Sequence, residues 1–450
     1  MPQVNDVRIK DVRCTFEDTP FRTPLKFGGR VVDGSQVANV AVTVETADGR
    51  RAEGRGSMPL GNVWGWPSPN IAPSDAAEAV RRLAGSASAW LASYPDAGHP
   101  LDIGSHLEHA LEGLAAEVVA ELGLSEPMPR LMALVAASSV DAALHDAYGK
   151  VHGRSVYACY GPEFVARDLS HYLTPEFQGE YLDRYVSPTP RPTFPLYHLV
   201  GAMDPLAAAD VVRPIGDGLP ETLADWIDQD GLTHLKIKLS GDDPAWDARR
   251  VLDVDRVAEA AGRRRGSAGW RYSLDFNERC DRPEQVLDLF DRLRTESPRA
   301  LERIQYVEQP TARDLHAEPR ADMHRVAAVR PVVIDESLTG LDSLLTALER
   351  GYSGVALKTC KGHGQALLMA AYARKNGLFL CVQDLTCPGA SFLHSAGLAA
   401  RIPGVEAIEG NGRQYCPAAN RAWEDRFGGV FHPRDGLIQT GLLDGPGLGC

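Results

Sequence analysis

The chain has 450 residues, of which 44% are hydrophobic and 24% are charged, as in an ordinary soluble globular protein. Its formal net charge is −13 and no basic tract dominates, which argues against nucleic-acid binding because that function needs a cationic face to neutralise phosphates. No apolar run approaches the roughly 20 residues of a membrane-spanning helix, and the first residues, Met1 to Asp6, lack a signal pattern, so we expect a cytoplasmic protein without membrane contact.

Residues 1–160 have the pattern of an α+β unit whose sheet precedes its helices. The stretch from Val37 to Val44 is rich in β-branched residues, and the Asp48-Gly49 pair after it is typical of a hairpin turn. Apolar residues at three- and four-residue spacing then predict helices near 75–93, 103–122 and 131–150.

An irregular connection, residues 161–193, separates this unit from a region with a different pattern. Between 194 and 410, short apolar strands alternate with amphipathic helices, which predicts βα units and a parallel sheet. Eight strands fit a closed barrel, and the tail, 411–450, is expected to return to the N-terminal unit. The predicted strands are 194–200, 233–239, 272–276, 304–307, 332–334, 354–357, 379–382 and 405–408.

Charged side chains stand at the C-terminal ends of several of these strands, the end at which TIM barrels carry their catalytic groups. Because side chains alternate along a strand, Lys236 and Lys238 share one face and Ile237 takes the other. Asp275 and Asn277 share a face in the same way. Lysines inside a barrel are costly unless anions compensate them, and the next strands supply those anions.

Three carboxylates on consecutive strands, Asp275, Glu308 and Asp335, would meet at the barrel mouth. Their mutual repulsion makes a bare cluster unfavourable, and a hard divalent cation removes the conflict. No His or Cys lies at these strand ends, so all-oxygen ligation favours Mg²⁺ over zinc. Any one of these carboxylates alone would be read as a salt-bridged strand end, but three in succession predict a magnesium site.

The two lysines Lys238 and Lys358 end the second and sixth strands, which are four apart in a ring of eight, so they should face each other across the barrel. A substrate carboxylate on the metal would then have its α-carbon between two amines. Metal coordination would stabilise the enediolate that forms when the α-proton leaves. Lys236 and the metal charge should lower a lysine pKa toward the working pH, roughly 7–8 in tuned examples.

These motifs resemble those of the enolase superfamily, and within it the muconate lactonizing enzyme-like subgroup of the mandelate racemase/muconate lactonizing enzyme family. The segment from Val140 to Lys150 is similar to that family's helix ahead of the barrel, so the likeness runs over most of the chain. The matching barrel motifs are Lys236-Ile237-Lys238, Asp275-Phe276-Asn277, Glu308-Gln309-Pro310, Asp335-Glu336-Ser337, and Leu357-Lys358 followed by Gly362 and Gly364.

The resemblance implies an α/β fold, a modified (β/α)₇β TIM barrel with an N-terminal α+β capping domain. It also implies Mg²⁺ as the cofactor, with Lys238 and Lys358 as acid/base residues and Lys236 supporting Lys238 and the substrate carboxylate. Asn277 would lie near the same site. A homo-oligomer, either a dimer or an octamer, is a further expectation from the resemblance.

Some residues depart from the patterns of similar proteins. The mandelate racemase branch uses a His–Asp pair on strands 6 and 7, whereas strand 7 here runs Val382-Gln383-Asp384, and His363 follows strand 6 too closely to replace that His. Strand 8 continues Glu409-Gly410-Asn411-Gly412 and lacks the Asp-x-Asp with which similar dipeptide epimerases hold an amino group. These departures leave the substrate open and the proton chemistry in place.

In the family that the chain resembles, loops of the cap set specificity, and two segments are candidates here. Thr19–Lys26 carries Arg22, and Gly61–Pro67 carries Trp64. Both side chains are expected to close on a small acid, with packing of cap on barrel as the alternative. The candidate substrate-binding residues are Asn277, Arg22, Trp64, Asp384 and Glu409.

Two opposed lysines permit several reactions. Proton removal on one face and return on the other gives a racemase or epimerase of a small carboxylic acid or amino-acid derivative, which we favour. Loss of a β-leaving group gives a dehydratase of a hydroxy or sugar acid, and the reverse of an addition gives a lactonizing cycloisomerase. A Schiff-base lysine barrel would leave the carboxylates without a task, and a non-catalytic carboxylate-binding relative would not need both lysines.

Overall fold

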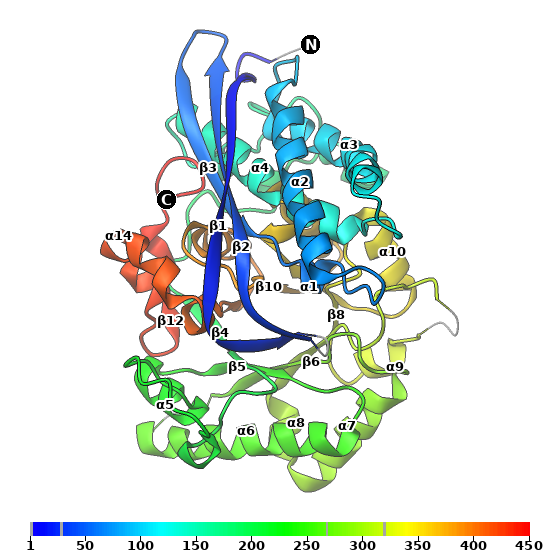
Figure 1. Cartoon of the computed structure of the whole chain (residues 1–450), viewed down its shortest axis with the longest axis vertical. Coiled ribbons are helices and arrows are strands. Elements are labelled where there is room, and N and C mark those ends of the chain that lie inside the picture. The colour runs from blue at the N-terminus through cyan, green and yellow to red at the C-terminus, as the bar shows by residue number, and fades with distance from the viewer. Residues whose placement is uncertain (1–2, 28–29, 267–268, 318–320) are drawn as a thin grey trace.

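The computed structural model describes residues 3–27, 30–266, 269–317 and 321–450. Its N-terminal sheet has three antiparallel strands in the order β1 (Val7–Phe27), β2 (Arg30–Thr46), β3 (Arg51–Pro59). The turn between β2 and β3 contains Gly49 at φ 86°, the left-handed conformation that the Asp-Gly pair predicts. The long β1–β2 ribbon runs from the top of the molecule down to the barrel (Figure 1).

Four helices complete this cap: α1 (Asn62–Gly65), α2 (Pro73–Ala92), α3 (Pro100–Glu121) and α4 (Arg130–Val151). Helix α4 is buried along almost its whole length, because it packs on the cap sheet and also on the barrel. Two glycines of β3 permit the close approach on the sheet side. A Cβ added to Gly54 would lie 2.0 Å from Ala147 N, and one added to Gly56 would lie 1.9 Å from Ser139 O.

Residues 152–193 connect the cap to the barrel through turns and four short 3₁₀ helices. These are η1 (Val156–Ala158), η2 (Leu169–His171), η3 (Pro175–Phe177) and η4 (Leu182–Arg184). The end of the connection is held on the barrel, where Ser187 N donates to Arg401 O at 2.7 Å and Arg191 N donates to Ala400 O at 2.9 Å.

Eight parallel strands form a closed barrel, because each pairs with the next and β11 pairs back with β4. The predicted barrel with an N-terminal capping domain is therefore confirmed, and the observed strands begin and end within about three residues of the predicted ones. The strands are β4 (Phe194–Val200), β5 (His234–Lys238), β6 (Arg271–Asp275), β7 (Ile304–Glu308), β8 (Val332–Ile334), β9 (Gly354–Leu357), β10 (Phe379–Val382) and β11 (Ile408–Glu409).

Helices connect these strands and surround the barrel, with α5 to α8 at the lower end in Figure 1. They are α5 (Leu223–Asp230), α6 (Pro244–Arg265), α7 (Glu284–Glu296), α8 (Pro298–Arg303), α9 (His324–Ala327), α10 (Leu341–Glu349), α11 (His363–Lys375) and α12 (Ala390–Ala399), with short 3₁₀ turns η5 (Ala208–Asp210) and η6 (Thr359–Lys361). Among the described residues, no helix is long and apolar enough to cross a membrane.

The C-terminal tail contacts both parts of the molecule. Its strand β12 (Leu437–Ile438) pairs antiparallel with β4, and the chain then reaches the cap, where Leu448 N donates to Asp146 of α4 at 2.9 Å. The other elements of the tail are α13 (Gly412–Tyr415), η7 (Pro417–Asn420), α14 (Arg421–Phe431) and η8 (Thr440–Leu442).

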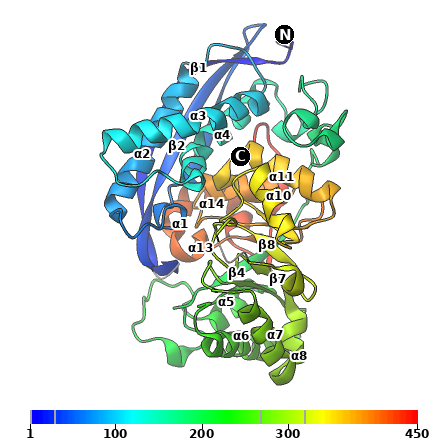
Figure 2. The same ribbon diagram turned by 90° about the vertical axis from the view of Figure 1, so that its right-hand side faces the viewer.

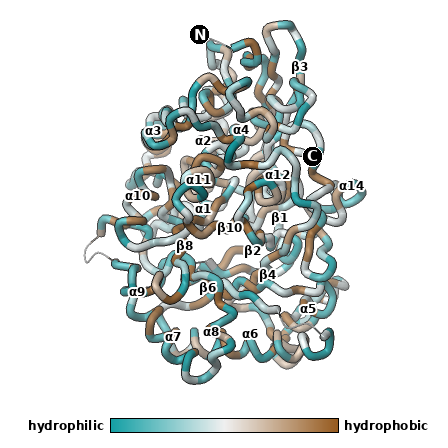
Figure 3. Tube along the Cα trace, turned by 180° about the vertical axis from the view of Figure 1, so that it is seen from behind, coloured by the Kyte–Doolittle hydropathy of each residue, from teal (hydrophilic) through white to brown (hydrophobic). Residues whose placement is uncertain are grey.

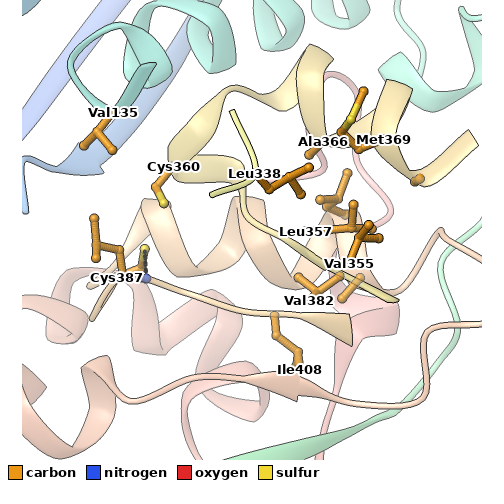
Figure 4. Close-up of a cluster of buried hydrophobic side chains, with 14 of the residues drawn as sticks. Val135, Leu338, Val355, Leu357, Cys360, Ala366, Met369, Val382, Cys387 and Ile408 are labelled. Atoms are coloured by element: carbon orange, nitrogen blue, oxygen red, sulfur yellow. Dashed lines mark hydrogen bonds between the residues drawn. The ribbon is translucent and has the colours of Figure 1, made fainter. Parts of the chain in front are cut away.

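Apolar packing fills the barrel and joins it to the cap. Seen from behind, hydrophobic stretches gather around α1, α11 and β10, where the two parts meet (Figure 3). Figure 4 shows part of this region, with Val135 of α4 near Cys360 and with Val355 and Leu357 of β9 packed near Val382 of β10. This packing fixes the cap directly above the C-terminal ends of the barrel strands.

One predicted loop is a strand. Thr19–Lys26, expected to be a cap loop that sets specificity, lies inside β1 and pairs with β2 across a register shift between Pro20 and Leu25. The prediction failed because the β-bulge and the proline interrupt the alternation that identifies a strand from sequence.

Candidate active site

Register places the predicted groups at one level of the barrel mouth. Lys238 at the end of β5 is paired with Asp275 of β6, and Asp275 is paired with Glu308 of β7. Lys236 lies one inward-facing position deeper, and Ile237 between the lysines packs outward in the apolar core. Lys358 follows β9 directly, on the strand opposite β5 in the ring of eight.

The ammonium group of Lys236 lies among three carboxylates. Its Nζ is 2.9 Å from Glu308 Oε1, 2.8 Å from Glu409 Oε2 and 3.1 Å from Asp275 Oδ2. Burial acts to lower the pKa of Lys236, but the charges of Glu308, Glu409 and Asp275 outweigh it and hold that pKa well above its ordinary value. Lys236 is therefore a fixed cation that binds three strand ends together.

Lys238 lies against Asp275 and the side chain of Asn277. Its Nζ donates to Asp275 Oδ2 and, at 3.0 Å, to Asn277 Oδ1. Asn277 has φ 45°, a left-handed conformation that Asn adopts more readily than most residues, and its N–H donates to Asp275 Oδ1 at 2.9 Å. The turn after β6 thus orients both a candidate base and a candidate metal ligand.

Two lysines bracket Asp335 at the end of β8. Lys358 Nζ lies 2.7 Å from Oδ2, and Lys361 Nζ lies 3.1 Å from Oδ1 and 2.5 Å from the backbone oxygen of the same residue. Gln309 Oε1 accepts from the N–H of Asp335 at 3.0 Å, which links β7 to β8. The sequence analysis did not single out Lys361. Its spacing of three from Lys358 could have indicated it, because one 3₁₀ turn returns residue i+3 to the same side.

Trp64 is the cap residue that reaches this cluster. Its indole lies over Lys358, with Nζ 4.6 Å from the ring centroid, and its Nε1 donates to Glu336 Oε1 at 2.9 Å. Both Trp64 and Glu336 are buried. An ammonium over a Trp face is stabilised by the ring quadrupole, so the cap contributes directly to the environment of Lys358.

Buried charge at the mouth does not balance. Counted with every group ionised, six carboxylates among the described residues stand against four ammonium groups. This is a formal excess of two negative charges among side chains that are at most 5% exposed. Burial and the neighbouring Asp275 hold the pKa of Glu308 well above its ordinary value. The carboxylates are Asp275, Glu308, Asp335, Glu336, Asp384 and Glu409, and the ammonium groups are those of Lys236, Lys238, Lys358 and Lys361.

This excess and the donor set fit a divalent cation bound by oxygen ligands, and Asp275, Glu308 and Asp335 are the residues that would hold it. Within the described ranges, no three His, Cys, Asp or Glu side chains converge as metal ligands. The lysine ammonium groups lie between the carboxylates instead, at the distances given above. The oxygen ligands of the site therefore suit Mg²⁺. In this structure the lysine ammonium groups neutralise the charge of those carboxylates.

The expected lowering of a lysine pKa is not what these contacts produce. Burial acts to lower the pKa of Lys358, but the Asp335 carboxylate 2.7 Å away outweighs it and raises that pKa above its ordinary value. The same pairing holds the pKa of Asp335 below its usual range, against the effect of burial. The predicted lowering counted the charge of a bound metal ion, so for the metal-bound site it stays a prediction.

Two other predicted residues, Arg22 and Asp384, lie in different surroundings. Arg22 donates to Asp217 in the loop after β4, with its Nη2 2.8 Å from Oδ1, so it ties the cap to that loop. Asp384 is buried beside Glu409 and accepts from Cys387 N at 3.1 Å. Burial, followed by the charge of Glu409, raises its pKa to about 7.

His363, considered as a possible replacement base, does not point to the lysines. It begins α11 and packs against His145 and Tyr157, with ring centroids 4.9 Å and 5.5 Å away. It is fully buried, and burial holds its pKa well below the ordinary value. His363 is therefore part of the packing between α4 and the barrel.

A cavity of ≈ 380 Å³ opens beside Lys238. Asn277, Met203 and Trp246 line it together with Lys26 from the cap and Arg279 from the loop after β6. Two carboxylates, Asp242 and Asp243, also line it, and Asp242 is paired with Arg279. Its volume lies in the range of small-molecule sites. A small acid in this cavity would lie against the Lys238 end of the cluster.

A capped TIM barrel with lysines and carboxylates buried at the C-terminal ends of its strands defines an enzyme of the enolase superfamily. The chain belongs to the enolase C-terminal domain-like family, whose sequence profile matches residues 218–450. The predicted likeness to the enolase superfamily and its mandelate racemase/muconate lactonizing enzyme group is thereby confirmed.

Individual relatives are distant. Muconate cycloisomerase 1 of Rhodococcus opacus is 25% identical over 416 residues, which cover 90% of this chain and 87% of that enzyme. N-succinylamino acid racemase of Thermus thermophilus is 26% identical over 261 residues, covering 57% of this chain and 63% of the racemase. The substrate-liganded L-Ala-D/L-Glu epimerase of Bacillus subtilis has a TM-score of 0.62 at 19% identity, covering 98% of both chains, and shares the fold.

Proposed function

We propose that this enzyme catalyses Mg²⁺-dependent removal of the proton α to a substrate carboxylate, leaving an enediolate, and acts as a racemase or epimerase of a small carboxylic acid or amino-acid derivative. The observation that carries this proposal is the position of Lys238 and Lys358 on opposite strands of the barrel, with the carboxylates of the intervening strands between them. One relative is named an N-succinylamino acid racemase, which agrees with this outcome.

The two lysines would divide the proton transfer between two faces of the substrate. A neutral amine on one side removes the α-proton, and the ammonium on the other side returns a proton to the opposite face. Asn277 fixes Lys238 through its 3.0 Å hydrogen bond, and the Trp64 ring confines Lys358. Lys236, held by three carboxylates, would keep its charge throughout and support the substrate carboxylate.

Asp275, Glu308 and Asp335 would hold Mg²⁺, in agreement with the excess of two buried negative charges. When bound, the ion would supply electrostatic stabilisation of the charge that develops on the substrate carboxylate. The carboxylates themselves are oriented by the chain, Asp275 through the Asn277 N–H and Asp335 through Gln309. Asp384 and Glu409 stay candidates for the distal end of the substrate, and assembly into a dimer or octamer stays a prediction.

Lactonizing cycloisomerisation is the second candidate. Muconate cycloisomerase 1 covers 90% of this chain, more than the racemase does. In that reaction too, Lys238 or Lys358 would transfer the proton at the carbon beside the carboxylate. The residues alone therefore do not separate racemisation from cycloisomerisation.

Incubation in D₂O with Mg²⁺ tests both candidates. The substrates are single stereoisomers of N-succinylamino acids and of dipeptides, together with muconate, which has no stereocentre. We expect α-deuterium in recovered substrate together with its opposite enantiomer. Lys238→Ala and Lys358→Ala should each abolish racemisation while leaving exchange of one enantiomer, a different one in each variant, and the surface variant Lys375→Ala should behave as wild type.

Three outcomes would count against racemisation. Lactone formation from muconate without exchange of amino-acid derivatives supports the cycloisomerase. Release of water from hydroxy or sugar acids without exchange supports a dehydratase. Exchange of both enantiomers by either lysine variant contradicts the roles assigned to the lysines, and exchange that survives in excess EDTA contradicts the role of Mg²⁺.

A further inference from the structure

A second, larger cavity lies between cap helix α3 and barrel helices α10 and α11. Its volume is ≈ 890 Å³, within the range typical of small-molecule sites. Figure 2 shows α3 of the cap above these two barrel helices. The described residues that line it include none of the four lysines at the barrel mouth. The cavity lies along the boundary between cap and barrel, and it shares Glu336 with the carboxylate cluster at the barrel mouth.

The charged side chains around this cavity are mostly acidic. Six carboxylates line it against two guanidinium groups, Arg130 and Arg313, and Arg313 is already engaged by Glu278, with Nε 2.8 Å from Oε1. The six carboxylates are those of Glu108, Glu112, Asp141, Asp314, Glu336 and Asp342.

The pKa of one of these carboxylates, Glu108, is raised in these surroundings. Glu108 of α3 lies 3.6 Å from Arg130, yet burial, followed by the charge of Asp141, raises its pKa to about 7. A nearby cation favours the ionised form of such a group. The lining of the cavity would therefore be stabilised by a positively charged occupant.

Two buried polar groups on the wall lack protein partners. Glu336 is 2% exposed, and its Oε1 accepts from Trp64, but its Oε2 has no hydrogen-bond partner among the residues that the structure describes. Gln365 of α11 is 6% exposed, and its amide nitrogen is equally without a partner there. Buried polar atoms are almost always hydrogen-bonded. The Glu336 oxygen needs a hydrogen-bond donor, so it points to a ligand that carries N–H groups. The Gln365 amide nitrogen is itself a donor, and such a ligand leaves it without a partner.

We propose that this cavity binds a small organic cation with several N–H donors, of the diamine or polyamine class. One ammonium group would donate to Glu336 Oε2, and a second would lie near Glu108 on the α3 wall. An ammonium carries three donors and a compact charge, which matches scattered carboxylates. A metal ion fits less well, because no three His, Cys, Asp or Glu side chains in the described part of the chain are arranged to hold one.

Calorimetric titration of the full chain with spermidine tests this site. The protein would be saturated with MgCl₂ at pH 8, in about 150 mM NaCl so that diffuse attraction is screened beyond a Debye length of about 8 Å. We expect one binding site whose affinity falls at least tenfold in Glu108→Gln and in Glu336→Gln. The control is Glu117→Gln, an exposed carboxylate of α3 outside the cavity, which should bind spermidine as wild type does.

Two results would overturn the proposal. Equal weakening in all three variants, or heat that vanishes at this salt concentration, would mean diffuse attraction to a chain of net charge −13. Binding of succinate in place of spermidine would mean an anion site. Glu108 lies partly exposed on a helix surface, so Glu108→Gln tests the proposal even if Glu336→Gln does not fold. The measurement detects binding and not turnover, so its outcome is independent of the proposed reaction.

Discussion

The indole of Trp64, a cap residue, covers the ammonium of Lys358, which directly follows barrel strand β9. The Lys358 Nζ lies 4.6 Å from the ring centroid. The same indole donates to Glu336, the residue after Asp335. The cap therefore does more than close the barrel, since it supplies one wall of the environment of a candidate acid/base residue.

Replacing Trp64 should lower the exchange rate, and more so when both the aromatic face and the hydrogen bond to Glu336 are removed. Trp64→Leu removes the cation–π contact, about 0.5–2 kcal/mol, and the hydrogen bond to Glu336, and we expect the α-deuterium exchange rate to fall about tenfold, the equivalent of about 1.4 kcal/mol. Trp64→Phe keeps an aromatic face and should lose less. Proton NMR of substrate in D₂O measures both. Equal rates in the two variants would mean that the ring face has no part in the effect.

Lys361 should stabilise the protein most when no divalent ion is present. Lys361→Met leaves Asp335 Oδ1 without its 3.1 Å partner and increases the excess of buried negative charge. We expect a loss of about 1–3 kcal/mol of stability, seen as a lower melting temperature, and a larger gain on adding MgCl₂ than wild type shows. Lys375→Met, on the surface of α11, is the control. A loss that MgCl₂ does not reduce would show that Lys361 acts through packing and not through charge.

Arg22 and Asp217 should act as a pair that holds the loop after β4 against the cap. If so, Arg22→Gln and Asp217→Asn each raise KM by a similar factor, and the double variant behaves like either single one, because the interaction is already lost. Direct contact between Arg22 and the substrate predicts a different pattern, in which Arg22→Gln alone impairs binding and Asp217→Asn has little effect. Initial rates over a range of substrate concentration separate the two.

The buried carboxyl of Asp384 should make stability depend on pH. Its pKa is raised from 3.8 to about 7 in the folded state, so the folded protein binds the proton more tightly than the unfolded chain does. Its stabilising contribution is complete below pH 4 and is lost as pH rises through about 7.

Asp384→Asn removes this titration, which gives a direct test. We expect the stability of wild type relative to the variant to fall by on the order of 2 kcal/mol between pH 4.5 and pH 8. Melting curves of both proteins at the two pH values, without added Mg²⁺, measure the difference. A difference that is constant with pH, or that grows toward pH 8, would contradict the raised pKa.

Much of the barrel was predictable because its strands are short, apolar and separated by helices of ordinary length. Gly354–Leu357 and Phe379–Val382 were predicted to the residue. The cap ribbon was predicted less well, since Thr19–Lys26 lies in a strand whose register shift hides its alternation. Periodicity identifies regular strands and fails where a bulge interrupts them.

The sequence alone determined which side chains share the inner face of the barrel at the ends of its strands, because a strand repeats every two residues whatever surrounds it: Lys236 with Lys238, and Asp275 beside them. Only the tertiary structure decided that Lys361 shares Asp335 with Lys358, that Arg22 pairs with Asp217, and that Trp64 covers Lys358. Those contacts join segments far apart in the chain, and their geometry depends on how the cap is packed on the barrel, which no local pattern encodes.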